Sequence, residues 1–128
     1  MTADILLIED DDDIRAEILE YLLRRCYRVT ACATVEEASE ALENVGGALA
    51  PDTIVADIRL PDGDGVSFYL ANARRFPRTK WILMSGNPDL VRLGNRVRNL
   101  THLPACAVID KPMALRLLDR FIQTPLAA

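Results

Sequence analysis

Residues 53–65 read TIVADIRLPDGDG, an apolar run that ends at Asp57 and passes into a turn rich in proline, glycine and aspartate. A short and continuous apolar run predicts a strand that is buried on both faces, as in a parallel sheet. This strand carries one carboxylate, Asp57, to its own C-terminal end. Ligands of open α/β sheets bind at that edge of the sheet, so Asp57 is the first candidate functional residue.

Other strand-like segments alternate with helical patterns along the rest of the chain. The further strands are predicted over residues 4–8, 27–33, 80–84 and 105–109. Apolar residues recur at helical spacing over residues 12–25, 34–45, 66–75, 88–100 and 113–122. Five strands that alternate with five helices predict an α/β domain with a parallel sheet covered by helices on both faces.

The composition limits the class of protein. A chain of 128 residues, half of them hydrophobic and 27% charged, suits one globular domain. The net charge of −4 argues against general nucleic-acid binding, and no apolar run approaches the roughly 20 residues of a membrane span. The N-terminus does not resemble a secretion signal, so we expect a cytoplasmic protein. Cys26, Cys32 and Cys106 lack metal-site spacing and are predicted to be small buried side chains.

Polar side chains follow four of the five predicted strands. Glu9 and Asp10 follow the first strand, Asp57 ends the third, Ser85 ends the fourth, and Lys111 comes after the last. If the strand order is 2-1-3-4-5, the first and third strands are neighbours, and the three acids converge. Ser85 and Lys111 then flank the acids from the other side.

Several carboxylates at one edge repel each other unless a cation neutralises them. Mg²⁺ prefers oxygen ligands, typically one or two carboxylates together with water and phosphate, and Mn²⁺ is an expected substitute. Lys111 would add a point charge suited to a phosphoryl oxygen, and Ser85 would add a hydroxyl donor. These are the parts needed to transfer a phosphoryl group onto Asp57.

Four separated motifs resemble the receiver domain of two-component response regulators. They are ILLIEDDDDIR at the N-terminus, VADIRLPDGDG around Asp57, ILMSG at Ser85 and VIDKP at Lys111. The resemblance implies a flavodoxin-like five-stranded parallel sheet of order 2-1-3-4-5. It also implies a receiver domain over residues 1–124 with a short tail at 125–128, working as a phosphoacceptor in signalling and not as an enzyme.

The resemblance implies a role for each site residue. Asp57 would be the phosphoacceptor, Asp10 would bind Mg²⁺ directly, and Glu9 would be its acidic partner. The backbone carbonyl of Arg59 would be a further metal ligand. Ser85 stands where a threonine or serine turns toward the phosphoryl group. Lys111 would pair with the phosphate, and its peptide bond to Pro112 is expected to be cis, as in many relatives.

The implied partners are a sensor histidine kinase or a phosphotransfer protein upstream and a protein target downstream that the sequence does not identify. No direct contact with nucleic acid or membrane is expected, and a phosphorylation-linked dimer stays open. Val108 stands where relatives carry an aromatic switch residue. The alternative is therefore a receiver-like interaction module that works without phosphorylation.

Two acidic stretches have simpler interpretations than metal binding. Residues 62–65, DGDG, resemble part of a calcium loop, but that pattern would place Leu60 at its first position and Ala71 at its twelfth. Turn chemistry explains this stretch better. Asp12 and Asp13 lie in the first turn of a predicted helix, where exposed negative charge is favourable.

Overall fold

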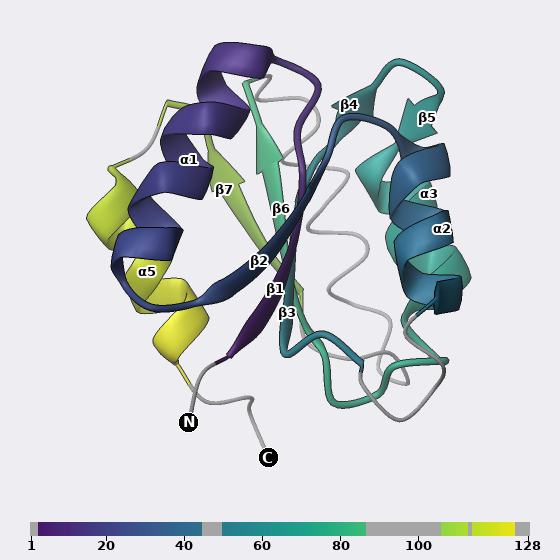
Figure 1. Ribbon diagram of the computed structural model, residues 1–128. Helices are drawn as coiled ribbons and strands as arrows, with labels where there is room; N and C mark the ends of the chain where they lie inside the picture. Colours follow the sequence, from purple (N-terminus) through teal and green to yellow (C-terminus); the bar gives the residue numbers. More distant parts are fainter. Residues whose placement is uncertain (1–2, 45–49, 87–105, 113, 125–128) are drawn as a thin grey trace.

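Five parallel strands form the central sheet in the computed structural model, which describes residues 3–44, 50–86, 106–112 and 114–124 (Figure 1). The strands are β1 (Asp4–Ile8), β2 (Arg28–Cys32), β3 (Thr53–Asp57), β6 (Lys80–Ser85) and β7 (Cys106–Asp110). They lie in the order β2-β1-β3-β6-β7. Counted within this sheet, the order is 2-1-3-4-5, so the predicted flavodoxin-like topology is confirmed.

The described helices cover the two faces of the sheet (Figure 1). α1 (Asp12–Arg24) and α5 (Leu115–Gln123) pack on one face, and α2 (Val35–Asn44) and α3 (Gly65–Asn72) pack on the other. The helix predicted over residues 88–100 lies outside the described residues. None of the helices in the described ranges has the length and apolar character needed to cross a membrane.

Alternate residues of each strand supply the two halves of the core. On β1, Ile5 and Leu7 face α1 and α5, whereas Leu6 and Ile8 face α2 and α3. All four side chains are at most 3% exposed. Because both faces of the sheet are covered, the inner strands β1, β3 and β6 are buried at almost every position, which explains their nearly continuous apolar runs, whereas the edge strand β2 exposes Arg28 and Thr30.

The segment after β3 forms a small hairpin where the sequence predicts only a turn. β4 (Arg59–Leu60) and β5 (Gly63–Asp64) pair antiparallel across the two residues 61–62. The chain then returns to the end of β3, because a Cβ atom at Gly65 would lie 2.5 Å from the backbone oxygen of Asp57. Only glycine permits so close an approach, and it closes residues 57–65 into a compact loop.

Cys26 departs from the sequence prediction. The helical spacing of α1 predicts Cys26 on the buried stripe, one turn after Leu22, but the residue is exposed, whereas Cys32 and Cys106 are buried as predicted. α1 ends at Arg24, and Cys26 has a φ of 68°, which turns the chain toward β2. The prediction for Cys26 was wrong because the helix ends before the stripe reaches it.

Candidate functional site

Asp57 lies at the end of β3, on the edge of the sheet where the strands terminate. Its side chain is nearly buried, with the residue 8% exposed. Its Oδ1 atom accepts a hydrogen bond from the backbone N–H of Arg59 at 3.3 Å, and its Oδ2 atom accepts one from Lys111 Nζ at 2.9 Å. Both carboxylate oxygens are therefore oriented by neighbours, one of them a cation.

Glu9 is the most deeply buried acid of the site. It follows β1 directly, its backbone N–H donates to the carbonyl of Cys32 at 2.9 Å, and its side chain is fully buried. Oε1 accepts from Lys111 Nζ at 2.7 Å, whereas the buried Oε2 has no hydrogen-bond partner among the described residues. Burial, together with the neighbouring Asp57, raises the pKa of Glu9 to about 7 despite the opposing effect of Lys111.

Lys111 joins the two buried acids from the end of β7. Its backbone N–H donates to the carbonyl of Ser85 at 2.8 Å, which anchors the residue beside β6. Burial would lower the pKa of the ammonium group, but hydrogen bonds to Glu9 and Asp57 raise it above its ordinary value. The side chain therefore stays charged. The Lys111–Pro112 peptide bond is cis, as predicted.

Asp10 completes an acidic cluster at this edge. Carboxylate oxygens of Glu9, Asp10 and Asp57 lie within 4.8 Å of one another, with Asp10 exposed to solvent. The set of oxygen donors suits a hard divalent cation. A buried oxygen normally has a polar partner, and a cation at this cluster would supply one for Oε2 of Glu9. The residues present therefore fit a magnesium ion.

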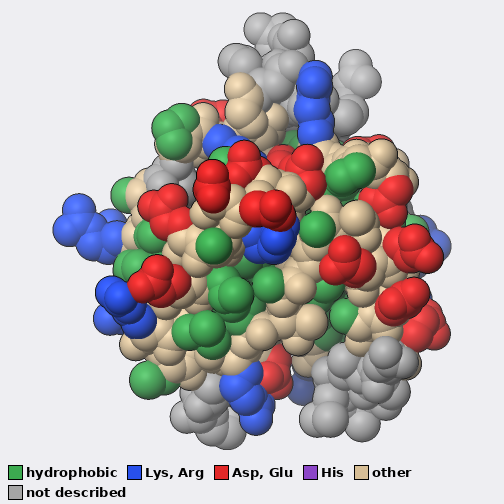
Figure 2. Space-filling model, turned by 45° about the horizontal axis from the view of Figure 1, so that its top comes forward, with side chains coloured by type: hydrophobic (Ala, Val, Ile, Leu, Met, Phe, Trp, Pro, Cys, Tyr) green, Lys and Arg blue, Asp and Glu red, His purple; other side chains and the backbone are tan. Residues whose placement is uncertain are grey.

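Ser85 closes the other side of the site. It is the last residue of β6, it is 2% exposed, and it pairs in register with Asp110 of β7. One residue before it, Met84 pairs with Asp57 across the two neighbouring strands. The topology thus brings Ser85 to the same edge as Asp57 and Lys111. Figure 2 shows acidic side chains gathered over this end of the molecule.

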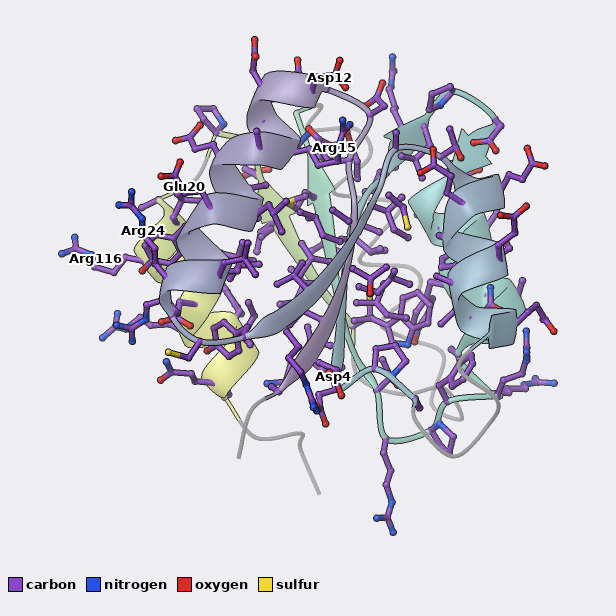
Figure 3. All side chains as sticks on the ribbon, in the orientation of Figure 1. Asp4, Asp12, Arg15, Glu20, Arg24 and Arg116 are labelled. Carbon is purple, nitrogen blue, oxygen red and sulfur yellow. The ribbon has the colours of Figure 1, made fainter. Side chains whose placement is uncertain are left out.

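Arg15 belongs to the surroundings of the site, although the sequence analysis did not select it. Its Nη1 atom donates to the backbone carbonyl of Glu9 at 3.0 Å, and its Nη2 atom donates to Asp12 at 2.6 Å. Figure 3 shows Asp12 and Arg15 close together at the start of α1. The signal in the sequence is the three-residue spacing of Asp12 and Arg15 on a helix, which places them on one face.

Asp11 and Asp64, one from each of the two acidic stretches, cap helices. Asp11 precedes α1 and accepts hydrogen bonds from the backbone N–H groups of Asp13 and Ile14. Asp64 precedes α3, and it accepts from the backbone N–H of Ser67 at 2.7 Å and from the hydroxyl of the same residue at 2.9 Å. These contacts agree with turn chemistry at residues 62–65 and with an exposed first helical turn at Asp12 and Asp13.

Comparison with known proteins gives a consistent result. Residues 5–123 match the family described as response regulator receiver domain. A receiver domain protein from Methanospirillum hungatei, described as CheY-like, superposes with a TM-score of 0.80 at 27% identity, covering 96% of this chain and 92% of that one. The non-phosphorylated HemR receiver domain from Leptospira biflexa gives a TM-score of 0.76 at 26% identity, with 99% of each chain covered.

Curated relatives are longer proteins. The chain is 31% identical over 117 residues to the sensor kinase CckA of Brucella abortus, covering 91% of this chain and 12% of the kinase. It is 35% identical over 115 residues to the transcriptional activator protein PfeR of Pseudomonas aeruginosa, covering 90% of this chain and 35% of the activator. The chain thus spans about a third or less of the length of these two relatives.

Proposed function

Because the chain belongs to the family of response regulator receiver domains, we propose that Asp57 accepts a phosphoryl group from a phosphohistidine of a sensor histidine kinase or phosphotransfer protein. The receiver domain is a phosphoacceptor signalling domain, and its place is in a phosphorelay. The observation that carries the assignment to Asp57 is its nearly buried carboxylate, hydrogen-bonded to Lys111 beside Glu9 and Asp10.

The proposed step forms one bond and breaks one. An oxygen of Asp57 attacks phosphorus, the bond between phosphorus and the imidazole nitrogen breaks, and the imidazole leaves with the electron pair. The product is an acyl phosphate, which water hydrolyses back to the carboxylate. Lys111, already in contact with the Oδ2 atom of Asp57, is placed to compensate the charge on the phosphoryl oxygens.

A magnesium ion is the proposed cofactor, with manganese as a substitute. Glu9, Asp10, Asp57 and the backbone carbonyl of Arg59 would hold it. When bound, the ion would neutralise negative charge on the acids and the phosphoryl group. Lys111 of the protein itself already offsets the repulsion between Glu9 and Asp57 and so keeps these two acids together.

Signalling follows from the added charge. Phosphorylation replaces the single negative charge of the Asp57 carboxylate with a phosphoryl group that carries about −1.5 to −2, and we expect Ser85 and Lys111 to move toward it. Val108, at the usual aromatic position, is a partly buried residue that packs against the core on the α2 and α3 side of the sheet. We therefore expect a switch that depends on Ser85 without an aromatic partner, with output through protein contacts and without direct binding to nucleic acid or membrane.

We further propose that residues 1–124 form the receiver domain, with 125–128 as a tail, in a cytoplasmic protein that does not act as an enzyme on a separate substrate. The kinase, the downstream target and any phosphorylation-linked dimer are proposals at the level of class. They follow from the family and from the mixture of kinases and transcriptional regulators among its relatives.

Labelling with a small phosphodonor tests the proposal. The protein is incubated with acetyl phosphate and Mg²⁺ and examined by intact mass spectrometry, and one added phosphoryl group is expected. Chelation of Mg²⁺ and the substitution Asp57→Asn should both abolish labelling, whereas Asp64→Asn, in the same loop, should retain it. If the wild type stays unlabelled while a control receiver domain is labelled, the interaction-module alternative is correct instead.

A further inference from the structure

The loop that carries the phosphoacceptor is attached to a helix far away in the sequence. Asp62, at the tip of the β4–β5 hairpin, accepts a hydrogen bond from the backbone N–H of Val35 on Oδ1 and from that of Glu36 on Oδ2, both at 2.9 Å. These two amides open α2. The hydrogen bonds lower the pKa of the Asp62 carboxyl group, so it is ionised at neutral pH.

Helix α2 needs this carboxylate because its own capping residue satisfies only part of its first turn. Thr34 Oγ1 accepts from the backbone N–H of Glu37 at 3.1 Å. The amides of Val35 and Glu36 are bound by Asp62 instead. A helix start leaves several N–H groups without intrahelical partners, and here two of them hold the hairpin.

A second contact fixes the same junction. A Cβ atom at Gly63 would lie 3.2 Å from Cγ2 of Val35, so the hairpin backbone packs tightly against the first residue of α2. The hairpin is short and internally paired, so a displacement of its tip is transmitted to its base. At that base, the backbone N–H of Arg59 donates to Oδ1 of Asp57. A continuous set of contacts therefore runs from α2 through Asp62 and the hairpin to the phosphoacceptor.

We propose that Asp62 is a positioning residue, which holds the Asp57 carboxylate and the Arg59 backbone in reactive geometry by fastening the hairpin to the N-terminus of α2. The position of α2 then sets the reactivity of Asp57, and a partner that displaces this helix start would slow phosphorylation. This inference rests on the proposed function of Asp57. It assigns no contact between Asp62 and the phosphoryl group or the metal.

The test compares two variants that both weaken the start of α2. Asp62→Ala removes the attachment of the hairpin, whereas Thr34→Ala removes a cap of α2 and leaves the hairpin attached. Groups that orient metal ligands typically contribute about 10-fold or more to metal affinity or activity. Asp62→Ala should therefore lower both the Mg²⁺ affinity, measured by calorimetry, and the phosphorylation rate about 10-fold. Thr34→Ala should change either quantity by less than about 2-fold.

Two further measurements separate positioning from a general loss of structure. Asp62→Asn keeps one oxygen acceptor and should recover part of the rate. The amide of Arg59 should exchange with solvent faster in Asp62→Ala than in Thr34→Ala, in the absence of Mg²⁺ and phosphodonor. Equal rates for Asp62→Ala and the wild type, or equal losses in both alanine variants, would overturn the inference. An unlabelled wild type would instead overturn the function proposed for Asp57.

Discussion

The acids beside Lys111 and the acids a few residues further along the chain are the same residue types in opposite surroundings. Glu9 and Asp57 are buried at strand ends and share one ammonium group. Asp11 and Asp62 are exposed at the starts of helices, where backbone N–H groups are their partners. Among these four acids, burial and not residue type separates the two that pair with a cation from the two that bind backbone N–H groups.

This difference determines how each group should respond to substitution. A buried carboxylate whose cation is removed loses a partner that solvent cannot replace, so both chemistry and stability should change strongly. An exposed capping carboxylate competes with water for the same amides, so its removal should cost moderate stability and leave the chemistry nearly unchanged. Asp62 is the exception, because it also fastens the loop that carries Asp57 to α2.

Lys111→Met should have the largest effect. It leaves the fully buried Glu9 and the nearly buried Asp57 without their shared cation. We expect the phosphorylation rate with acetyl phosphate to fall about 100-fold, as for other lost charge-stabilising donors. We also expect a loss of about 2–3 kcal/mol in the free energy of unfolding at pH 8 without Mg²⁺. Urea unfolding and intact mass spectrometry measure the two quantities.

Lys80→Met is the matched control. Lys80 Nζ donates to the backbone carbonyls of Phe121 and Ile122, each at 2.8 Å, and to that of Thr124, all at the C-terminal end of α5. Its removal should lower stability without slowing phosphorylation, because the contacts of Asp57 stay in place. Equal rate losses in the two variants would show that Lys111 acts only through the stability of the fold.

Glu9→Gln should change how stability depends on pH. The pKa of Glu9 rises from 4.5 to about 7 on folding, so the folded state keeps a proton that the unfolded state has lost. The stabilisation from Glu9 is therefore present below pH 4.5 and is lost as the pH rises to about 7. Relative to Glu9→Gln, the metal-free wild type should lose about 2–3 kcal/mol between pH 4.5 and pH 8.

Urea unfolding with chelator at several pH values measures this difference. Glu17→Gln, which changes an exposed glutamate of α1, should follow the wild-type curve throughout. Parallel curves for the wild type and Glu9→Gln would show that Glu9 is as well solvated as the exposed acids. The distinction between the two groups of carboxylates would then fail.

The sequence predicted the buried acids better than the capping ones. The apolar runs before Glu9 and Asp57 indicate buried parallel strands, whose ends must meet at one edge, and the resemblance supplied the strand order. Lys111 was predicted in the same way, from its place after the apolar run at residues 105–109. Asp62 is 27 residues away in the sequence from Val35, its partner in α2, so no local sequence pattern predicts this contact. The hairpin has only two residues in each strand, too few for an alternation to be detected.

Cys26 shows a different limit of sequence patterns. Its spacing continues the buried stripe of α1, so periodicity alone predicts burial. A positive φ in a residue other than glycine is uncommon, and the residues beside Cys26 include no glycine that would predict the turn. Helix ends that depend on packing against the next strand are therefore predicted less well than helix starts with capping residues such as Asp11.

Loss of a cap should have a moderate effect on stability alone. Asp11→Ala removes the acceptor for two amides of α1, and Asp64→Ala removes the acceptor for the amide and hydroxyl of Ser67. Each substitution should lower the free energy of unfolding by about 1 kcal/mol and Tm by about 3–5 °C. Calorimetry measures the shift, and phosphorylation rates should stay within about 2-fold of the wild type. A loss as large as that of Lys111→Met would place these acids in the reacting site.

Asp12→Asn should have the smallest effect, although it breaks an ion pair of 2.6 Å with Arg15. The Asp12 side chain is 86% exposed, so water screens the pair and replaces the lost contact. Arg15 also keeps its separate hydrogen bond to the backbone carbonyl of Glu9 at 3.0 Å. We expect Tm to change by less than about 2 °C and the phosphorylation rate to stay the same. If Asp12→Asn instead slowed phosphorylation while Asp13→Asn did not, the exposed Asp12 would act on the site through Arg15 and the backbone of Glu9. Burial would then fail to separate Asp12 from Glu9 and Asp57.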